Sequence, residues 1–273
     1  MDHQIHIIGS SGFLGRALQR CHCDGDLILW SHQGKDQRNA NYFDLSNVNS
    51  WQNLCDFKPK NVILLSWPGL PNYDNEFHLT ENLPQSIRLI NHLILAGCES
   101  ITVAGTCYEY GLKSGALKEA ELTEPVNLYG IAKDTLRRFT ACQCAAAGVN
   151  WTWTRIFYPY GEGQNPKSLY PSLLRAINQN NLSFPMGSGK QIRDFIPVDN
   201  LAKCMLRLAC SGASHGVVNL GSGNPKSIRN FVEDIIEASS SSLQLQLGVY
   251  PDRINEPEAF WADTSKLDSL LAT

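Results

Sequence analysis

The first part of the chain alternates short apolar runs with segments of helical periodicity. The runs have the length of β-strands, and they lie at 5–8, 27–30, 62–65, 101–104 and 151–157. The segments between them repeat apolar residues at helical spacing, and they lie at 13–18, 87–94 and 128–147. Gly97 and Gly148 stand where the second and third helices are predicted to end. Strands that alternate with helices predict an α/β fold with a parallel, doubly wound (Rossmann-like) sheet.

The pattern becomes richer in loops beyond the strand at 151–157. Prolines and glycines crowd the stretch 159–189, which favours a smaller domain packed over the ends of the strands. Two amphipathic helices follow, at 201–208 and 228–236, and Ser227 is placed to cap the second. We therefore expect two unequal domains.

Composition narrows the classes of function. Hydrophobic residues make up 43% of the 273 residues and charged residues 18%, which is typical of a globular protein with a sizeable core. The formal net charge of -3, without a run of Lys and Arg, argues against a broad nucleic-acid footprint. The apolar runs fall far short of a membrane span, and the start of the chain lacks the pattern of a secretory signal. We expect neither nucleic acid nor a membrane among the partners.

Nine cysteines at irregular spacing predict reduced thiols and a cytoplasmic protein, because an odd number does not complete a disulfide framework. Cys21-His22-Cys23 and Cys142-x-Cys144 suggest a metal site, but each lacks a second ligand pair at zinc-site spacing. We predict no metal, and we interpret these cysteines as small apolar residues of the interior.

A glycine turn follows the first predicted strand. Gly9, Gly12 and Gly15 stand three apart, between the strand at 5–8 and the helix at 13–18. A tight turn, a close approach of the backbone to a pyrophosphate and close packing of the helix on the sheet each select a residue without a side chain. The helix N-terminus then offers free N–H groups to the phosphates. This context predicts a dinucleotide site, although the spacing differs from the fingerprint with glycines at one, three and six.

The end of the second strand bears on the choice between NAD and NADP. An acidic residue there would select a free ribose hydroxyl, but 30–33 contains none, and Lys35 and Arg38 lie just beyond. This favours NADP, with NAD kept open because these cations also suit a solvated loop, in which case Asp44 and Leu45 contact the adenine edge. The residues expected to bind the cofactor are Gly9, Ser11, Gly12, Phe13, Leu14, Gly15, Ser31, Asp44, Leu45, Ser66 and Lys133.

Tyr129 and Lys133 are four apart on the predicted helix at 128–147 and therefore share one face. A phenol with a pKa near 10 exchanges protons reluctantly at neutral pH. An ammonium about 4 Å away would favour the phenolate by roughly 4 kcal/mol, or nearly three pKa units. Thr106 ends the strand at 101–104, at the edge of a parallel sheet where ligands bind. The three residues predict a site that protonates a carbonyl oxygen.

At this point the chain resembles the extended short-chain dehydrogenases, and among them the nucleotide-sugar reductases, epimerases and dehydratases. The resemblance spans nearly the whole chain, and its motifs occur in the order of that family: the glycine turn at 9–15, a hydroxyl residue followed by Tyr-Gly at 106–111, Tyr-x-x-x-Lys at 129–133, a strand ending in Tyr-Gly at 155–161, a substrate-phosphate segment at 191–199, the segment 219–223 and the late Arg253.

The resemblance implies a role for each of these residues. Tyr129 would be the general acid–base, Lys133 would hold the nicotinamide ribose and tune Tyr129, and Thr106 would hydrogen-bond the sugar oxygen. Arg193 and Arg253 would clasp the diphosphate of a nucleotide-sugar substrate, because the guanidinium fork suits phosphate. The domains implied are a dinucleotide-binding domain over 1–160 and a mainly substrate-binding domain over 161–273, with a segment around 191–215 returning to the first.

Departures from the family pattern narrow the reaction. Dehydratases carry Asp-Glu directly after the Thr, where this chain has Cys107 and Tyr108. A cysteine that supports 3,5-epimerisation stands two after the hydroxyl residue, whereas Cys107 is one after Thr106. Tyr158 replaces the usual Asn before the later Tyr-Gly, at a position expected to contact the sugar. A 4-keto reductase and a 4-epimerase remain.

The NADP preference favours a reductase of a nucleotide-linked 4-keto-6-deoxysugar, since a reductase must exchange its cofactor in each turnover. A 4-epimerase with retained NAD is the alternative. A non-catalytic dinucleotide-binding sensor is a third reading, against which the complete set of Thr106, Tyr129 and Lys133 argues. The resemblance also implies a homodimer formed through the helix that carries Tyr129 and the helix before it.

Overall fold

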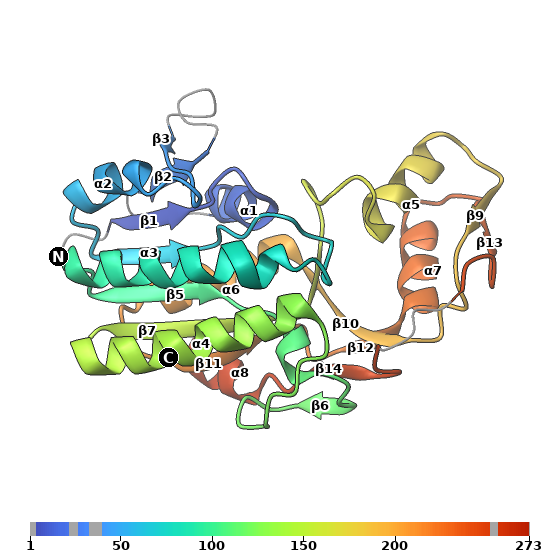
Figure 1. Cartoon of the computed structure of the whole chain (residues 1–273). Coiled ribbons are helices and arrows are strands. Elements are labelled where there is room, and N and C mark those ends of the chain that lie inside the picture. The colour runs from blue at the N-terminus through green and yellow to red at the C-terminus, as the bar shows by residue number, and fades with distance from the viewer. Residues whose placement is uncertain (1–3, 22–26, 33–39, 252–255, 273) are drawn as a thin grey trace.

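A parallel sheet of seven strands forms the centre of the fold (Figure 1). The computed structural model describes residues 4–21, 27–32, 40–251 and 256–272. The sheet has the order β11-β7-β5-β4-β1-β2-β3, and all its neighbours pair in parallel. In chain order the strands are β1 (Ile5–Ile8), β2 (Leu27–Ser31), β3 (Asn41–Tyr42), β4 (Asn61–Leu64), β5 (Ser100–Ala104), β7 (Asn150–Ile156) and β11 (Gly216–Leu220). The predicted α/β fold with a doubly wound sheet is confirmed.

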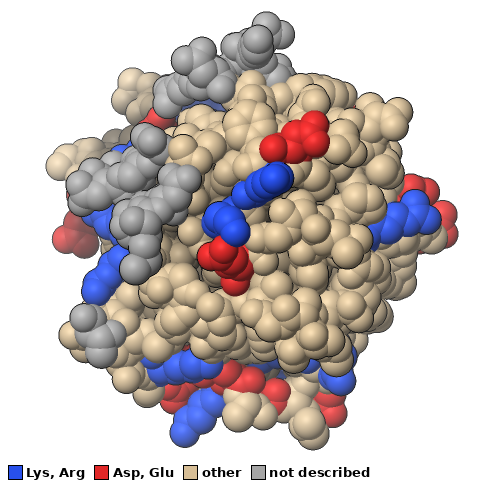
Figure 2. Space-filling model, turned by 90° about the vertical axis from the view of Figure 1, so that its left-hand side faces the viewer, with Lys and Arg blue, Asp and Glu red and all other residues tan. Residues whose placement is uncertain are grey.

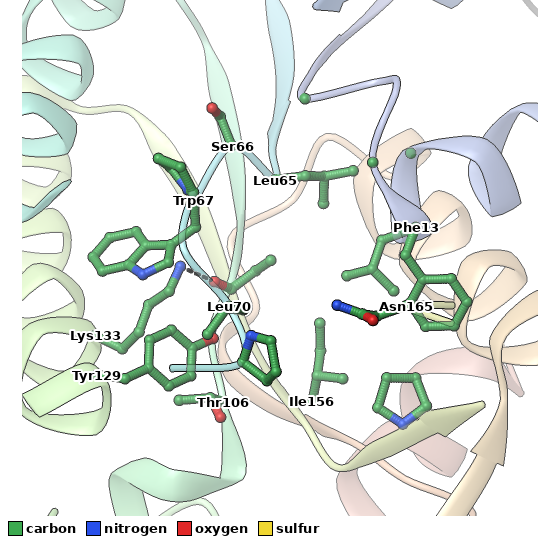
Figure 3. A pocket seen from close by; sticks show the side chains of 18 of the residues that line it. Phe13, Leu65, Ser66, Trp67, Leu70, Thr106, Tyr129, Lys133, Ile156 and Asn165 are labelled. Carbon is green, nitrogen blue, oxygen red and sulfur yellow. Dashed lines mark hydrogen bonds between the residues drawn. The ribbon is translucent and has the colours of Figure 1, made fainter. Parts of the chain in front are cut away.

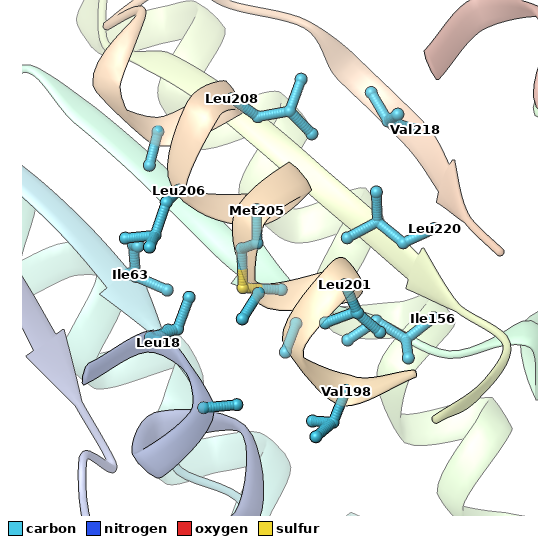
Figure 4. Packing of buried hydrophobic residues seen from close by; sticks show 14 of the residues in the cluster. Leu18, Ile63, Ile156, Val198, Leu201, Met205, Leu206, Leu208, Val218 and Leu220 are labelled. Atoms are coloured by element: carbon cyan, nitrogen blue, oxygen red, sulfur yellow. The ribbon is translucent and has the colours of Figure 1, made fainter. Parts of the chain in front are cut away.

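Helices cover both faces of this sheet. On one face lie α1 (Phe13–Cys21), α6 (Val198–Cys210) and α8 (Ser265–Leu271), and their apolar side chains form one core cluster with the strands. Figure 4 shows Leu201, Met205 and Leu208 of α6 directed toward this cluster. On the other face lie α2 (Asn49–Asp56), α3 (Leu83–Leu95) and α4 (Leu128–Ala147). Because both faces are covered, the central strands read as continuous apolar runs.

Helix α4 begins and ends where the sequence predicts. The Asn127 side chain accepts a hydrogen bond from the Gly130 amide at 2.7 Å, which satisfies one of the amides left unpaired in the first turn. Gly148 ends the helix with a φ of 68°, in the left-handed region that glycine adopts without strain. Local interactions at the two caps therefore fix where the helix that carries Tyr129 and Lys133 begins and ends.

A smaller lobe lies beyond the carboxyl ends of the strands (Figure 1, right). Its core packs two helices against short strands. The elements are β8 (Tyr158–Tyr160), α5 (Leu169–Asn178), β9 (Ser183–Pro185), β10 (Ile192–Pro197), β12 (Pro225–Ser227), α7 (Ile228–Ala238) and β13 (Gln244–Gln246). Ser227 caps α7 by accepting a hydrogen bond from the Asn230 amide, as predicted. Between the two lobes β6 (Gly115–Leu117) pairs with β14 (Phe260–Ala262).

The chain crosses between the lobes more than once. After β10 it returns through α6 and β11 to the large sheet, and after the smaller lobe it returns again in α8. We propose a division at residue 160 in which these returning segments belong to the first domain. A π-helical turn, η2 (His78–Asn82), precedes α3, and a 3-10 turn, η3 (Cys107–Tyr110), follows β5.

Figure 2 shows basic and acidic side chains interspersed on the face that it presents. No helix in the described part of the chain is long and apolar enough to cross a membrane. Among these residues, none of the eight cysteines forms a disulfide and no cluster of three ligand-type side chains could hold a metal. Cys144 is buried, but Cys142 is exposed, which corrects its prediction as an interior residue. His22 and Cys23 lie outside the described residues.

Candidate active site

A cavity of about 750 Å³ opens at the carboxyl edge of the large sheet. Its lining includes the residues that follow β1, β2, β4, β5 and β7. From β1 the chain proceeds to β2 and β3 on one side, whereas β4, β5, β7 and β11 lie on the other. The direction of winding reverses between β1 and β4, and the crevice outside such a reversal is where doubly wound sheets bind ligands. Its size is that of a cofactor or substrate site.

The glycine turn forms one wall of this cavity. Gly9, Gly12 and Gly15 line it together with Ser11, Phe13 and Leu14. A Cβ atom on Gly15 would lie 2.5 Å from the carbonyl oxygens of Gly9 and Ser10, closer than packed atoms approach. The first turn of α1 is therefore pressed against the turn before it, and its N-terminal amides face the space where an anion would be held.

Polar groups at the far end of the cavity fit an adenosine ribose. Ser31 ends β2, is 2% exposed and lines the cavity, and its hydroxyl has no hydrogen-bond partner among the described residues. A buried hydroxyl without a partner is costly unless a ligand satisfies it. Asp44, Leu45 and Ser66 line the same cavity. The lining thus fits a dinucleotide. Lys35 and Arg38, on which the NADP prediction rests, lie outside the described residues.

Thr106, Tyr129 and Lys133 lie together on one side of the cavity, across from Phe13 and Asn165 (Figure 3). Tyr129 and Lys133 project from α4, and Thr106 follows β5. The Lys133 ammonium donates a hydrogen bond to the Ala104 carbonyl at 2.8 Å and lies 3.9 Å from the centre of the Trp67 ring. Thr106 lies close enough to the Tyr129 phenol to act on its pKa, which it lowers against the larger effect of burial. The fold therefore unites the three residues that the sequence singled out.

Burial controls the protonation of this group. It raises the pKa of Tyr129, chiefly because the phenolate would lose its hydration. Burial also lowers the pKa of Lys133 to about 7, against a smaller opposing effect of Glu109. In this structure the pKa of Tyr129 shows no net lowering, so the role of Lys133 in tuning it stays a prediction. The Lys133 nitrogen lies 5.9 Å from the centre of the Tyr129 ring, and the loss of hydration outweighs any attraction at that distance.

The depressed pKa of Lys133 predicts a pH-dependent contribution to stability. In the unfolded chain the amine titrates near 10.5, so between pH 7 and 10.5 the unfolded state binds a proton that the folded state does not. The free energy of unfolding of the wild type, relative to Lys133→Met, should therefore rise by on the order of a few kcal/mol between pH 7 and 10. Urea unfolding of both proteins at several pH values measures this, and a constant difference would contradict it.

Aromatic side chains form much of the remaining lining. Trp67, Tyr73 and Tyr108 line the cavity beside Tyr158, which the sequence predicted as a substrate contact. The Tyr73 and Tyr129 ring centres are 5.7 Å apart, and those of Trp67 and Tyr129 are 6.0 Å apart. Sequence reasoning missed Trp67, although the residues after a strand of a doubly wound sheet are where such a contact is expected.

The structure does not bring Arg193 into the cavity. Its side chain is buried, and its guanidinium donates to the Tyr158 hydroxyl at 3.0 Å, to the Glu256 carboxylate at 2.9 Å and to the Pro257 carbonyl at 2.8 Å. These partners occupy most of its N–H groups, and the described cavity lining does not include Arg193. That Arg193 clasps a diphosphate therefore stays a prediction. Through its hydrogen bond to the Tyr158 hydroxyl, the guanidinium holds a side chain that lines the cavity. Arg253 lies outside the described residues.

Comparison with known proteins agrees with this geometry. A model of the NAD dependent epimerase/dehydratase family matches residues 5–221. The dTDP-6-deoxy-L-talose 4-dehydrogenase (NAD(+)) of Aggregatibacter actinomycetemcomitans is 29% identical over 201 residues, which cover 73% of this chain and 74% of that protein. The dTDP-4-dehydro-6-deoxyglucose reductase of Escherichia coli is 26% identical, over 85% of this chain and 80% of that protein.

Solved structures share the fold over almost the full length. The structure of RMD from Pseudomonas aeruginosa complexed with NADPH matches with a TM-score of 0.84 at 21% identity, over 98% of this chain and 92% of that one. MoeE5 in complex with UDP-glucuronic acid and NAD matches with a TM-score of 0.82 at 24% identity and the same coverage. At these identities the likeness establishes the fold.

Proposed function

The chain belongs to the NAD dependent epimerase/dehydratase family, and from this premise we propose that it reduces the keto group of a nucleotide-linked 4-keto-6-deoxysugar. The observation that carries the proposal is the meeting of Thr106, Tyr129 and Lys133 in one cavity. Beside Thr106 the described lining residues are Cys107 and Tyr108, neither of which is a carboxylic acid. Elimination of water lacks its acid–base pair there.

The protonation of Tyr129 suits reduction. The phenol carries its proton at neutral pH and can donate it to a carbonyl oxygen that becomes a strongly basic alkoxide, although burial, which raises its pKa, makes it a weaker acid than a free phenol. The Thr106 hydroxyl is placed to hydrogen-bond the same oxygen. Gly9, Gly15, Ser31 and Lys133 would hold the dinucleotide, which supplies the hydride when bound. Burial raises the pKa of the Cys107 thiol, so that this residue is inert as a base.

The names of the relatives support this reading. They include a reductase of dTDP-4-dehydro-6-deoxyglucose and 4-dehydrogenases of dTDP- and GDP-linked 6-deoxytalose. A reduction at C4 and a dehydrogenation at C4 are one reaction run in opposite directions. A UDP-glucose 4-epimerase from Corynebacterium glutamicum is 27% identical over 68% of this chain, so epimerisation is the reading that the experiment must separate.

The experiment mixes the purified protein with NADPH or NADH and dTDP-4-dehydro-6-deoxyglucose. Loss of absorbance of the reduced cofactor, with the reduced sugar found by mass spectrometry, is the expected result. Conversion of a UDP-hexose to its 4-epimer without added cofactor would assign the epimerase activity instead. Tight dinucleotide binding without turnover of any nucleotide sugar would assign a sensor.

The cofactor preference is testable at the end of β2. Ser31→Asp puts a carboxylate in the lining, where it would accept hydrogen bonds from a free ribose and repel a 2′-phosphate. We propose NADPH as the exchanged cofactor, and we expect this variant to lower the ratio of NADPH to NADH affinity at least about tenfold, the effect of about 1.4 kcal/mol. Fluorescence titration of both dinucleotides measures the ratio, with Ser31→Ala as the control. An unchanged ratio would place the adenosine elsewhere.

A further inference from the structure

A fully buried carboxylate lies directly beneath the strand end that carries Thr106. Glu109 has no exposed surface, its carboxylate oxygens accept hydrogen bonds from three groups, and Arg137 Nε lies 3.8 Å from Oε2. Its Oε1 atom accepts from the Thr106 amide at 2.9 Å and from the Trp153 indole at 2.8 Å, and its Oε2 atom accepts from Arg155 at 2.8 Å. A set of donors favours the ionised carboxylate, while complete burial acts in the opposite direction and raises the pKa of Glu109. Two cations beside Oε2 and the geometry of these bonds lead us to treat it as ionised, and bonds to a charged acceptor are the stronger kind.

The surroundings of this carboxylate are closely packed. A Cβ atom on Gly105 would lie 2.1 Å from the Trp153 indole nitrogen and 2.8 Å from Glu109 Oε1, so the strand end fits this network only as glycine. The guanidinium of Arg155 is itself buried and lies 4.4 Å from the centre of the Tyr110 ring. A buried ion pair of this kind adds little net stability, whereas the loss of one partner alone is costly.

The segment that Glu109 holds contains two of the contacts on which the site depends. Thr106 lies at its end, with its backbone amide tied to Glu109. Two residues earlier, the Ala104 carbonyl accepts the hydrogen bond from Lys133. The Thr106 side chain in turn accepts from the Tyr108 amide at 3.3 Å, which completes a reciprocal cap of η3. The carboxylate is therefore bonded to the backbone of the residue that carries the hydroxyl, two residues after the carbonyl that accepts from the amine.

We propose that Glu109 is a positioning residue that fixes Thr106 for the reaction through the hydrogen bond to its amide, an inference that rests on the proposed function. Glu109 acts behind the cavity and is absent from its described lining. The negative charge of Glu109 also reaches the cavity: it raises the pKa of Tyr129, and it partly offsets the lowering of the pKa of Lys133 by burial.

Removing the carboxylate alone would leave Arg155 as a buried unpaired cation, so the test uses a background without that cation. Both proteins of the matched pair carry Arg155→Met. One also carries Glu109→Gln, and the other carries Glu109→Met. The glutamine oxygen can still accept the bonds from Thr106 and Trp153, whereas methionine has the same length and no strong acceptor. The two proteins differ in whether residue 109 offers an acceptor to the Thr106 amide and the Trp153 indole.

We expect kcat of the methionine member to lie at least about tenfold below that of the glutamine member, with dinucleotide affinity within about twofold. When Thr106→Val is added to both members, their kcat values should differ by less than about twofold, because Glu109 acts on the reaction through Thr106. The proposal is overturned if the two members of the matched pair have equal kcat values. It is also overturned if the ratio of their kcat values is as large with Thr106→Val as without it.

A readout without turnover keeps the two proposals separate. Hydrogen exchange of the Thr106 amide should be at least about tenfold faster in the methionine member than in the glutamine member. If the wild type converts no nucleotide sugar, the proposed function fails, and the exchange rates still decide whether Glu109 holds the strand end. Rapid exchange of this amide in the wild type overturns the inference even if neither double variant folds.

Discussion

Tyr129→Phe is expected to lower kcat for reduction of a nucleotide-linked 4-keto-6-deoxysugar by about a thousandfold, while dinucleotide affinity stays within about twofold. The phenol is placed in the cavity beside Thr106, and general acid catalysis by a positioned side chain contributes about a hundredfold to ten-thousandfold. Phenylalanine keeps the ring that packs against Trp67 and Tyr73 and removes only the proton donor. Steady-state kinetics with a dinucleotide titration measures both quantities.

Tyr160→Phe is the matched control for this experiment. Tyr160 lies in the smaller lobe against Tyr170 and Phe231 and is absent from the described cavity lining. We expect the removal of the Tyr160 hydroxyl to leave kcat within about twofold of the wild-type value. Equal activity of Tyr129→Phe and the wild type would show that another group supplies the proton, and the mechanism given above would be abandoned.

Gly15→Ala should weaken dinucleotide binding about a hundredfold and destabilise the protein. The added Cβ atom would lie 2.5 Å from two backbone oxygens of the glycine turn, which no side-chain rotation can relieve. Either α1 moves outward or the turn opens, and strain of this kind typically costs about 1–3 kcal/mol. A loss of about 2.7 kcal/mol in binding is a hundredfold change in affinity. Isothermal titration and thermal unfolding measure the two effects.

Gly97→Ala separates the close approach from a general cost of replacing glycine. Gly97 has a φ of 88°, so alanine is strained there, but nothing lies within 4 Å of its added Cβ atom. We expect a loss of stability of about 1 kcal/mol and unchanged dinucleotide affinity. Equal weakening of binding in both variants would mean that the loss at Gly15 is global and does not report on the turn.

Local patterns in the sequence determined much of the large lobe. The strands at 5–8 and 101–104, the glycine turn and the helix at 128–147 follow from hydrophobic period, capping and backbone freedom, all of which act between near neighbours. The same locality places Tyr129 and Lys133 on one helical face. Strand β3 was missed because two residues are too few for a period, and β11 because its short run was interpreted only through the motif at 219–223.

Only the tertiary structure decided what surrounds those residues. Arg193 carries the donors that suit a diphosphate, yet Tyr158, Glu256 and Pro257 use them inside the protein. Glu109 follows Thr106 by three residues in sequence, but the partners that make it a buried anchor, Trp153 and Arg155, come from a strand more than forty residues later. Residue type and spacing fix which contacts a side chain can make. Burial and the partners present in the folded chain decide which it does make, and they also set the protonation of Tyr129 and Lys133.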